Sequence, residues 1–190
     1  MMIIRASTLK KTPWKNGGGL TTEIIRFGRD GRVGDPASGE DFSWRLSFAE
    51  IKTNTAFSIF SGYDRVLTVW EGNGIKLGGA TLLPLTPFYF SGDLALEAKL
   101  TDGSVVDLGL IYRRTEWSAK MSVSAHVANL VANLVANETN LIFVIAGKLD
   151  INGGQAGARD TVVFDWSGSA ADITTSRDFK AICITLTRCR

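Results

Sequence analysis

The segment 13–23 combines side chains that bind small polar molecules. Trp14 offers an apolar wall, Asn16 a carboxamide and Glu23 a carboxylate, with three consecutive glycines between the last two. Glycines expose backbone amides and adopt positive φ at little cost, so the segment could hold a polar ligand. A plain turn or a linker is the alternative, since both use glycine runs. No phosphate-binding loop is predicted, because the chain lacks a G-x-x-x-x-G-K-[ST] motif.

Two further segments place charged residues where they could face one cavity. Asp64 ends a predicted Ser-Gly-Tyr-Asp turn and Arg65 follows it, and at a turn both side chains could reach the same cavity. An Asp that caps the turn beside a surface Arg is an equal alternative. Asp107 and Arg113 share one face of a predicted strand over 105–113, because every second residue of a strand points the same way. Two adjacent arginines end that strand, and such pairs more often belong to a solvated face.

The segment 42–48 alternates between apolar and polar side chains. The predicted apolar face carries Phe42, Trp44, Leu46 and Phe48, and the opposite face carries Ser43, Arg45 and Ser47. Periodicity leaves open whether the polar face meets water or a polar cavity. In a cavity, Arg45 could bind a carboxylate in bidentate geometry.

Composition argues against several kinds of catalytic centre. The chain has one histidine, His126, and two cysteines, so a first-row metal centre is not expected. No Asp-x-Asp loop indicates Ca²⁺ or Mg²⁺, and no G-x-S-x-G elbow indicates a nucleophilic serine. We therefore expect neither a metal nor a cofactor. In an enzyme, Glu23, Asp64 or Asp107 would have to act as general acid or base. Binding without catalysis is the simpler hypothesis.

Length and charge are those of an ordinary globular protein. The 190 residues are 45% hydrophobic and 21% charged, enough for one substantial core or two small lobes. A net charge of +2 without a basic run gives no reason to expect nucleic acid as a partner. Apolar runs are too short to span a bilayer, and the N-terminus lacks a signal-peptide core, so no membrane partner is expected.

The two cysteines indicate the compartment. Cys183 and Cys189 lie on one predicted strand, where six residues of extended chain separate their Cα atoms by roughly 20 Å. A disulfide permits no more than about 7 Å. A bond between them is therefore not expected, and a reducing cytoplasm is the simplest setting.

Short β-type segments with Gly, Pro or Asx between them run along the whole chain. This spacing predicts an all-β sandwich or barrel rather than βαβ units. A break near 115–119 divides the motif-rich part from the rest, so we expect lobes at 1–115 and 116–190. Residues 28–41 indicate a long surface loop, either a lid or a simple insertion. For residues 125–138, helix, loop and irregular strand all remain open.

Five of these segments, taken in order, resemble the HutD/Ves family of cupin-like proteins. They cover residues 13–24, 42–47, 57–65, 85–93 and 107–114. The Trp-Lys-Asn-Gly-Gly-Gly and Trp-Arg pieces are specific as a pair. The resemblance extends through most of residues 13–114, and beyond it the chain shows only general β character.

The resemblance implies an RmlC-like double-stranded β-helix, or jelly roll, in two antiparallel β-sandwich lobes. Such a bicupin would have a pocket in its first lobe and would lack the usual metal-binding histidines. The resemblance also implies a link to histidine utilisation or to stress response, with a formylated glutamate as one suggested ligand. Carried onto this chain, the pocket candidates are Trp14, Asn16, Glu23, Arg45, Asp64, Arg65, Asp107 and Arg113.

We therefore expect a cytoplasmic, metal-free protein that binds a small polar metabolite with a carboxylate or formyl-amino-acid group, in a regulatory role. One alternative is a carboxylate-dependent isomerase, lyase or hydrolase that uses the same pocket. Another is a protein-interaction module without a ligand, which predicts a closed first lobe. The β-rich lobes are also compatible with a homodimer.

Overall fold

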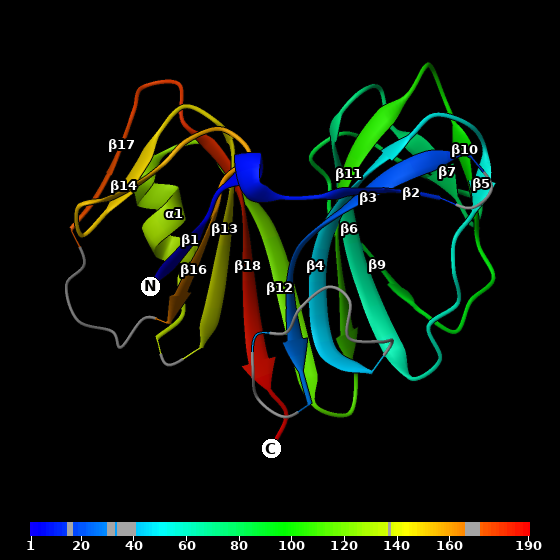
Figure 1. Cartoon of the computed structure of the whole chain (residues 1–190), viewed down its shortest axis with the longest axis horizontal. Helices are drawn as coiled ribbons and strands as arrows, with labels where there is room; N and C mark the ends of the chain where they lie inside the picture. The colour runs from blue at the N-terminus through cyan, green and yellow to red at the C-terminus, as the bar shows by residue number, and fades with distance from the viewer. Residues whose placement is uncertain (15–16, 30–32, 34–40, 137, 166–171) are drawn as a thin grey trace. The chain divides into compact units, whose positions relative to one another are not determined.

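The computed structural model describes residues 1–14, 17–29, 33, 41–136, 138–165 and 172–190. Most of the predicted loop at 28–41 lies outside these residues, as does Asn16. Within them the chain is almost entirely β, as the turn-separated segments predict (Figure 1). None of the described helices is long and apolar enough to cross a membrane.

Eighteen strands, one short 3₁₀ turn and one α-helix follow one another in the described residues. The elements before residue 72 are β1 (Met2–Ile4), the 3₁₀ turn (Ala6–Thr8), β2 (Lys11–Pro13), β3 (Gly19–Gly28), β4 (Phe42–Ile51), β5 (Thr55–Ala56) and β6 (Tyr63–Glu71). Those up to residue 124 are β7 (Ile75–Leu77), β8 (Ala80–Leu82), β9 (Phe88–Ser91), β10 (Glu97–Leu100), β11 (Val105–Arg113) and β12 (Trp117–Ser124). The remainder are α1 (Val127–Asn133), β13 (Thr139–Ala146), β14 (Leu149–Ile151), β15 (Gly154–Ala156), β16 (Thr161–Asp165), β17 (Ile173–Thr175) and β18 (Lys180–Arg188).

These elements form two compact units. The larger unit comprises Leu9–Trp117 with Cys189–Arg190, and the smaller unit comprises Met1–Thr8 with Ser118–Arg188. The first eight residues, which the sequence analysis assigned to the first lobe, cluster with the later part of the chain because β1 pairs antiparallel with β16.

The smaller unit contains a five-stranded sheet, a three-stranded sheet and α1. The strand orders are β1-β16-β13-β18-β12 and β15-β14-β17. Within the stretch whose conformation the sequence left open, Val127–Asn133 forms a helix. Leu130 in this helix and Leu134 at its C-terminal end are buried in the core. Asn140 fixes the chain after the helix, since its Nδ2 donates to the carbonyl oxygens of Val135 and Glu138.

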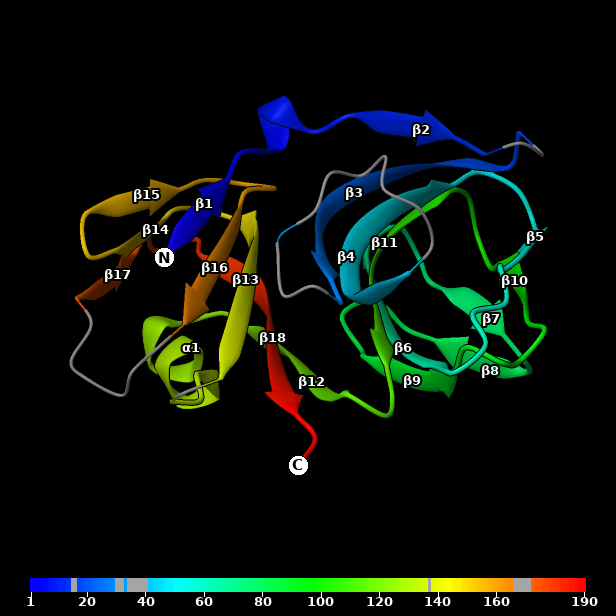
Figure 2. The ribbon, with the colours of Figure 1, turned by 60° about the horizontal axis from the view of Figure 1, so that its bottom comes forward.

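The larger unit combines a six-stranded sheet with a four-stranded sheet (Figure 2). The strand orders are β2-β3-β4-β11-β6-β9 and β5-β10-β7-β8, and the pairings in the six-stranded sheet are antiparallel. A compact apolar core draws residues from both sheets: Ile51, Leu67, Val69, Ile75, Leu77, Leu82, Ala98 and Val105.

Strand register aligns three of the predicted site residues: Arg45, Arg65 and Asp107. Arg45 on β4 lies opposite Ile111 on β11, and Ile111 lies opposite Arg65 on β6. We call Arg45, Ile111 and Arg65 the arginine row. The next two rows along the same face are Ser47–Gly109–Leu67 and Ala49–Asp107–Val69. Antiparallel pairing therefore places two arginines and one aspartate from three strands on one face of the sheet.

Register shifts interrupt the simple alternation of β3 and β4. Glu23 pairs with Ser47 whereas Ile25 pairs with Leu46, so Ile24 forms a bulge on β3. A second shift lies between Phe27 and Gly28 on β3, where β4 carries the extra residue. The alternation predicted that Phe42 and Trp44 share a face. Because of this shift they do not. The ring of Phe42 lies 5.2 Å from the Arg45 guanidinium carbon.

Candidate ligand-binding site

A cavity of about 460 Å³ lies on the face of the six-stranded sheet that carries the arginine row. Its size falls in the range of small-molecule sites, about 300–1,000 Å³. Strands β2, β3, β4, β5, β6 and β11, residue Trp14 after β2 and the segment after β5 supply its wall. The lining residues are Pro13, Trp14, Thr21, Arg45, Ser47, Ala49, Ala56, Phe57, Ser58, Phe60, Arg65, Val66, Leu67, Asp107, Gly109 and Ile111.

Four of the eight predicted site residues line this cavity: Trp14, Arg45, Arg65 and Asp107. They come from segments far apart in the sequence, and the antiparallel sheet brings them together. Asn16 lies outside the described residues. Glu23, Asp64 and Arg113 are described but do not belong to the cavity wall, and their contacts are given below.

Arg65 is held in place by aromatic rings and a backbone carbonyl. Its guanidinium carbon lies 4.8 Å from the ring centroid of Phe57, 5.1 Å from that of Phe90 and 5.6 Å from that of Phe60. Its Nη1 donates to the carbonyl oxygen of Ser58 at 3.1 Å. Cation–π contacts of this kind fix the side chain without neutralising its charge. The guanidinium group of Arg65 therefore keeps its charge and is held in a fixed position in the cavity wall.

Arg45 shares one of these rings. Its guanidinium carbon lies 5.2 Å from the centroid of Phe60 and 5.2 Å from that of Phe42. Arg45 also forms a long ion pair with Glu23, with 3.9 Å between Arg45 Nε and Glu23 Oε2. Phe60, which lies in the family-like segment 57–65 but was not among the predicted site residues, thus contacts both cavity arginines.

Asp107 is the acidic group of the cavity. Burial raises its pKa to about 6, although the charge of Arg65 and a hydrogen bond from the Ala49 backbone act in the opposite direction. Burial also lowers the pKa of Arg65 to about 10. Asp107 counteracts that change, whereas the like charge of Arg45 adds to it. Arg65 remains fully charged at neutral pH, so the cavity holds two cations and one anion of adjustable charge.

Glu23 pairs with a residue that sequence reasoning missed. Arg26 donates from Nη2 to Glu23 Oε2 at 2.8 Å and from Nε to Oε1 at 3.1 Å. The Arg26 guanidinium carbon also lies 5.3 Å from the centroid of the Phe42 ring. Both charged side chains are largely buried, with exposed fractions of 8% for Arg26 and 14% for Glu23. The pair lies beside Arg45 on the neighbouring strand, since Arg26 pairs with Arg45 and Glu23 pairs with Ser47.

Asp64 belongs to an ion-pair cluster at the ends of β6, β9 and β11. Arg114 Nε lies 3.1 Å from Asp64 Oδ1, and Arg114 Nη2 lies 2.7 Å from Asp93 Oδ2. The same nitrogen donates to the carbonyl oxygen of Tyr63 at 2.6 Å. Asp93 in turn accepts from the Gly62 amide at 2.9 Å. Asp64 therefore helps to fix a turn, which is the structural alternative that its sequence context allowed.

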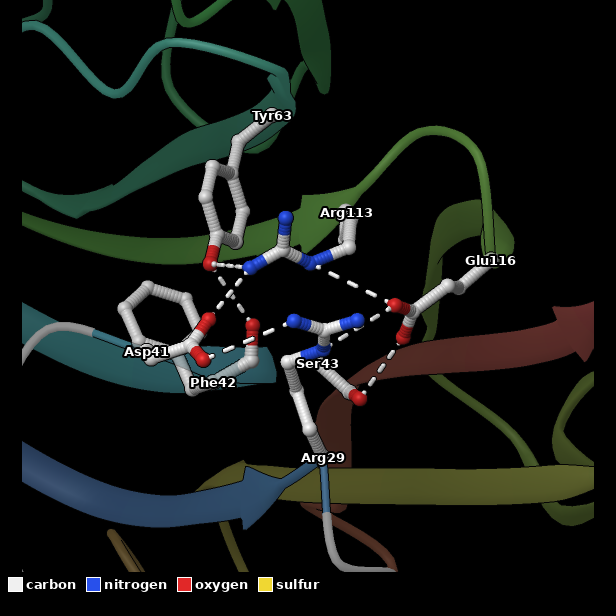
Figure 3. A network of polar contacts seen from close by, with 7 residues as sticks. All are labelled: Arg29, Asp41, Phe42, Ser43, Tyr63, Arg113 and Glu116. Carbon is white, nitrogen blue, oxygen red and sulfur yellow. Dashed lines mark hydrogen bonds and ion pairs between the residues drawn. The ribbon is translucent and has the colours of Figure 1, made fainter.

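Arg113 lies in a second network, drawn in Figure 3. Its Nη2 contacts Asp41 Oδ1 at 2.5 Å and donates to the Tyr63 hydroxyl at 2.8 Å, and its Nε lies 3.4 Å from Glu116 Oε1. The Tyr63 hydroxyl donates in turn to the Phe42 carbonyl oxygen at 2.8 Å. Arg113 thus ties three strands together and does not point into the cavity.

Trp14 owes its position to the glycine run that follows it. Its indole Nε1 donates to Thr21 Oγ1 at 2.6 Å, and its carbonyl oxygen accepts from the Gly17 amide at 3.0 Å. A Cβ on Gly19 would lie 2.4 Å from the carbonyl oxygen of Glu50, and Gly17 has a φ of +71°. Gly17 thus adopts a conformation that favours glycine, and Gly19 lets β3 approach both the backbone of Glu50 and the Trp14 ring.

The described residues were also compared with the expectations for metal ligands and for the two cysteines. Among the residues that the structure describes, no three His, Cys, Asp or Glu side chains converge in a way that could hold a metal ion. Both cysteines are free thiols, Cys183 buried and Cys189 exposed. The side chains that line the cavity offer guanidinium, carboxyl, hydroxyl and aromatic groups.

Comparison with known protein sequences identifies the relatives of this chain. The HutD family model matches residues 6–181. An uncharacterised 21.2 kDa protein in the hutC 3′ region of Pseudomonas putida is 33% identical over 157 residues, which cover 80% of this chain and 77% of the relative. Protein Ves of Citrobacter koseri is 35% identical over 148 residues, which cover 73% of this chain and 71% of the relative.

Solved structures agree with the sequence matches. HutD from Pseudomonas fluorescens is 32% identical and superposes with a TM-score of 0.78 over 100% of this chain and 99% of that one. A cupin 2 conserved barrel domain protein from Leptotrichia buccalis is 11% identical and shares the fold, with a TM-score of 0.51 over 93% of this chain and 92% of that one. The fold is therefore cupin-like, and the chain belongs to the HutD family.

Proposed function

We propose that the larger unit is a metal-free cupin lobe that binds a small carboxylate-bearing metabolite, and that the smaller unit is the second lobe of a bicupin. One arrangement carries the proposal: Arg45, Arg65 and Asp107 surround a cavity of about 460 Å³. Two guanidinium groups against one carboxyl group favour an anion. The aromatic and aliphatic wall favours a ligand about as large as an amino acid derivative.

The biological setting that we propose is the regulation of histidine utilisation. The name of the Pseudomonas putida relative refers to the hutC region, and this association supports the proposal. A role in stress response is the other setting that the resemblance implied. Two unpaired cysteines are in keeping with a reducing cytoplasm as the place of action.

Calorimetric titration of the purified protein with formylglutamate, urocanate and related acids tests the binding proposal. We expect at least one acid to bind, and we expect Arg45→Ala to weaken that binding at least about tenfold because it removes a charged hydrogen-bond donor. Arg5→Ala is the matched control, because Arg5 pairs with Asp160 in the smaller unit. The proposal fails if no acid releases heat or shifts the melting temperature of a folded wild-type protein.

A second candidate is an enzyme that acts on a small acid in the same cavity. The raised pKa of Asp107, about 6, supports this candidate, because a carboxyl group that titrates near neutrality suits general acid–base catalysis. Turnover of a bound acid that disappears in Asp107→Asn while binding persists would favour the enzyme. Binding without turnover in the wild type would favour the non-catalytic protein.

The third hypothesis, a protein-interaction module without a ligand, predicted a closed first lobe. A cavity of about 460 Å³ that is lined by buried charge is the opposite of that expectation. We therefore rank the interaction module below the two ligand-based functions.

A further inference from the structure

We propose that the ligand lies directly on the backbone of Gly109, and that it is therefore an extended acid reaching from the arginine row to Asp107. The inference rests on the proposed function, because it concerns the same cavity. It adds the shape of the ligand and the chemistry of its two ends.

Gly109 occupies an unexpected position for a glycine. It lies in the middle of β11, a strand that pairs on both sides, and glycine in the interior of a strand weakens that strand. Its φ is not among the positive values of the described glycines. A Cβ built on it would meet only the Leu67 Cβ, at 3.9 Å, which is ordinary van der Waals contact.

Packing therefore does not require a glycine at this position, unlike at Gly19, where an added Cβ would collide with the carbonyl oxygen of Glu50. The added carbon at residue 109 would instead enter the cavity, because Gly109 is part of its wall. A glycine inside a strand often marks a place where a ligand approaches the backbone closely. The cavity supplies the space for such an approach.

The rows around Gly109 define the direction of the ligand. On one side is the arginine row, with Ile111 at its centre, and on the other side is Asp107. Ile111 and Asp107 are four residues apart on β11, which corresponds to roughly 13 Å of strand. Gly109 lies between them in the cavity wall and has no side chain. A narrow molecule can therefore lie along β11 and contact both charged ends.

The two ends call for different groups on the ligand. Arg45 and Arg65 suit a carboxylate, since guanidinium groups bind carboxylates through paired hydrogen bonds. Asp107 suits an N–H donor, either an amino or an amide group, because an ionised carboxyl group can only accept hydrogen bonds. The middle of the ligand must be slim and unbranched to lie against Gly109. The class is thus an extended acid with a nitrogen donor at its far end.

Titration calorimetry with ω-amino acids of increasing length, from glycine to aminooctanoate, tests this inference, with acetate as the short probe. We expect wild-type affinity to peak at an intermediate length. Gly109→Ala should weaken the best-binding ω-amino acid at least about tenfold, because its methyl group occupies the ligand's place, while acetate affinity stays within about twofold. Its melting temperature should be unchanged or higher, since alanine suits a strand better than glycine.

Gly157→Ala is the matched control, since an added Cβ there meets nothing within 4 Å and Gly157 lies outside the cavity wall. Ser47→Val narrows the same part of the cavity from the neighbouring strand and should produce the same selectivity, which covers the case that Gly109→Ala folds poorly.

Three results overturn the inference. The first is an unchanged affinity of Gly109→Ala for the best-binding ω-amino acid, and the second is an equal loss for acetate and for that acid. The third is a wild-type affinity that does not depend on chain length although acetate binds. In each of these cases the proposed function survives, whereas wild-type protein that binds none of the acids overturns both.

Discussion

Arg26 binds Glu23 through two parallel hydrogen bonds, of 3.1 Å from Nε and 2.8 Å from Nη2, although the two residues are three positions apart on β3. On a regular strand such residues point to opposite faces. The bulge at Ile24 reverses the alternation and turns Arg26 to the side of Glu23. A local irregularity of one strand thus creates a buried ion pair beside the cavity.

Breaking this pair should cost stability. Arg26→Met leaves the Glu23 carboxylate buried with only the more distant Arg45 nearby, so we expect the free energy of unfolding to fall by about 3 kcal/mol. Urea denaturation followed by circular dichroism measures the change. Lys11→Met is the matched control, because it removes the exposed pair between Lys11 and Glu50 and should cost less than about 1 kcal/mol. Equal losses in the two variants would contradict the prediction.

The ring of Phe60 should matter for ligand binding although it carries no charge. Phe60→Leu removes the aromatic face that both cavity arginines share, so each guanidinium gains conformational freedom that binding must then restrict. We expect affinity for the best-binding acid to fall about five- to tenfold, as measured by titration calorimetry. Phe179→Leu, in the core of the smaller unit, controls for a general loss of packing. Unchanged affinity in Phe60→Leu would mean that the other rings suffice.

Asp107 should make stability depend on pH in an unusual direction. Its folded-state pKa, about 6, lies above the ordinary value of 3.8. The folded state therefore retains a proton that the unfolded state loses as pH rises from about 4 to about 6. Stability should decline over this window and level off above it, by about 3 kcal/mol in total.

The measurement is the difference in unfolding free energy between wild type and Asp107→Asn at several pH values. The difference is needed because other carboxyl groups also make the stability of the protein depend on pH. The pKa values of Asp93 and Asp160 are lowered in the folded state, so the stability that these groups contribute is lost as pH falls. We expect the wild type to lose stability relative to the variant as pH rises. Parallel curves for the two proteins between pH 4 and 7 would show that burial does not raise the Asp107 pKa.

Arg113 should separate stability from binding. Arg113→Ala removes contacts to Asp41, Tyr63 and Glu116 at a partly buried place, so we expect a loss of about 1–2 kcal/mol in unfolding free energy. Acid binding by the folded variant should stay within about twofold of the wild type, since Arg113 is not part of the cavity wall. Calorimetric titration below the melting temperature checks this expectation. A tenfold loss of affinity would return Arg113 to the list of ligand-binding candidates.

Much of the fold follows from local sequence patterns. Turn residues between short apolar segments predicted the all-β chain, because glycine and Asx residues end strands wherever they occur. The face shared by Asp107 and Gly109 was also predictable, since β11 is regular along this part of its length. The helix at Val127–Asn133 was not, because its Asn and Val residues are poor helix formers and only tertiary burial of Leu130 decides its conformation.

The site was predictable where charge and motif pointed to it, and not where register decided. Trp14, Arg45 and Arg65 stand in distinctive segments, and all three line the cavity. Arg26 carries no such signal, because a one-residue bulge determines which face it occupies. Phe60 does stand in the family-like segment 57–65, but only the folded sheet brings the two arginines to its ring, so its role could not be predicted.

The pairing of β1 with β16 has a consequence for how the polypeptide matures on the ribosome. Every strand of the larger unit emerges before residue 118, so that unit can complete its sheets early. The first eight residues must wait for β16 before they find their neighbours. Chains that end between about residue 118 and residue 160 should therefore already contain the larger unit in protease-resistant form, while their extreme N-terminus is still open to cleavage.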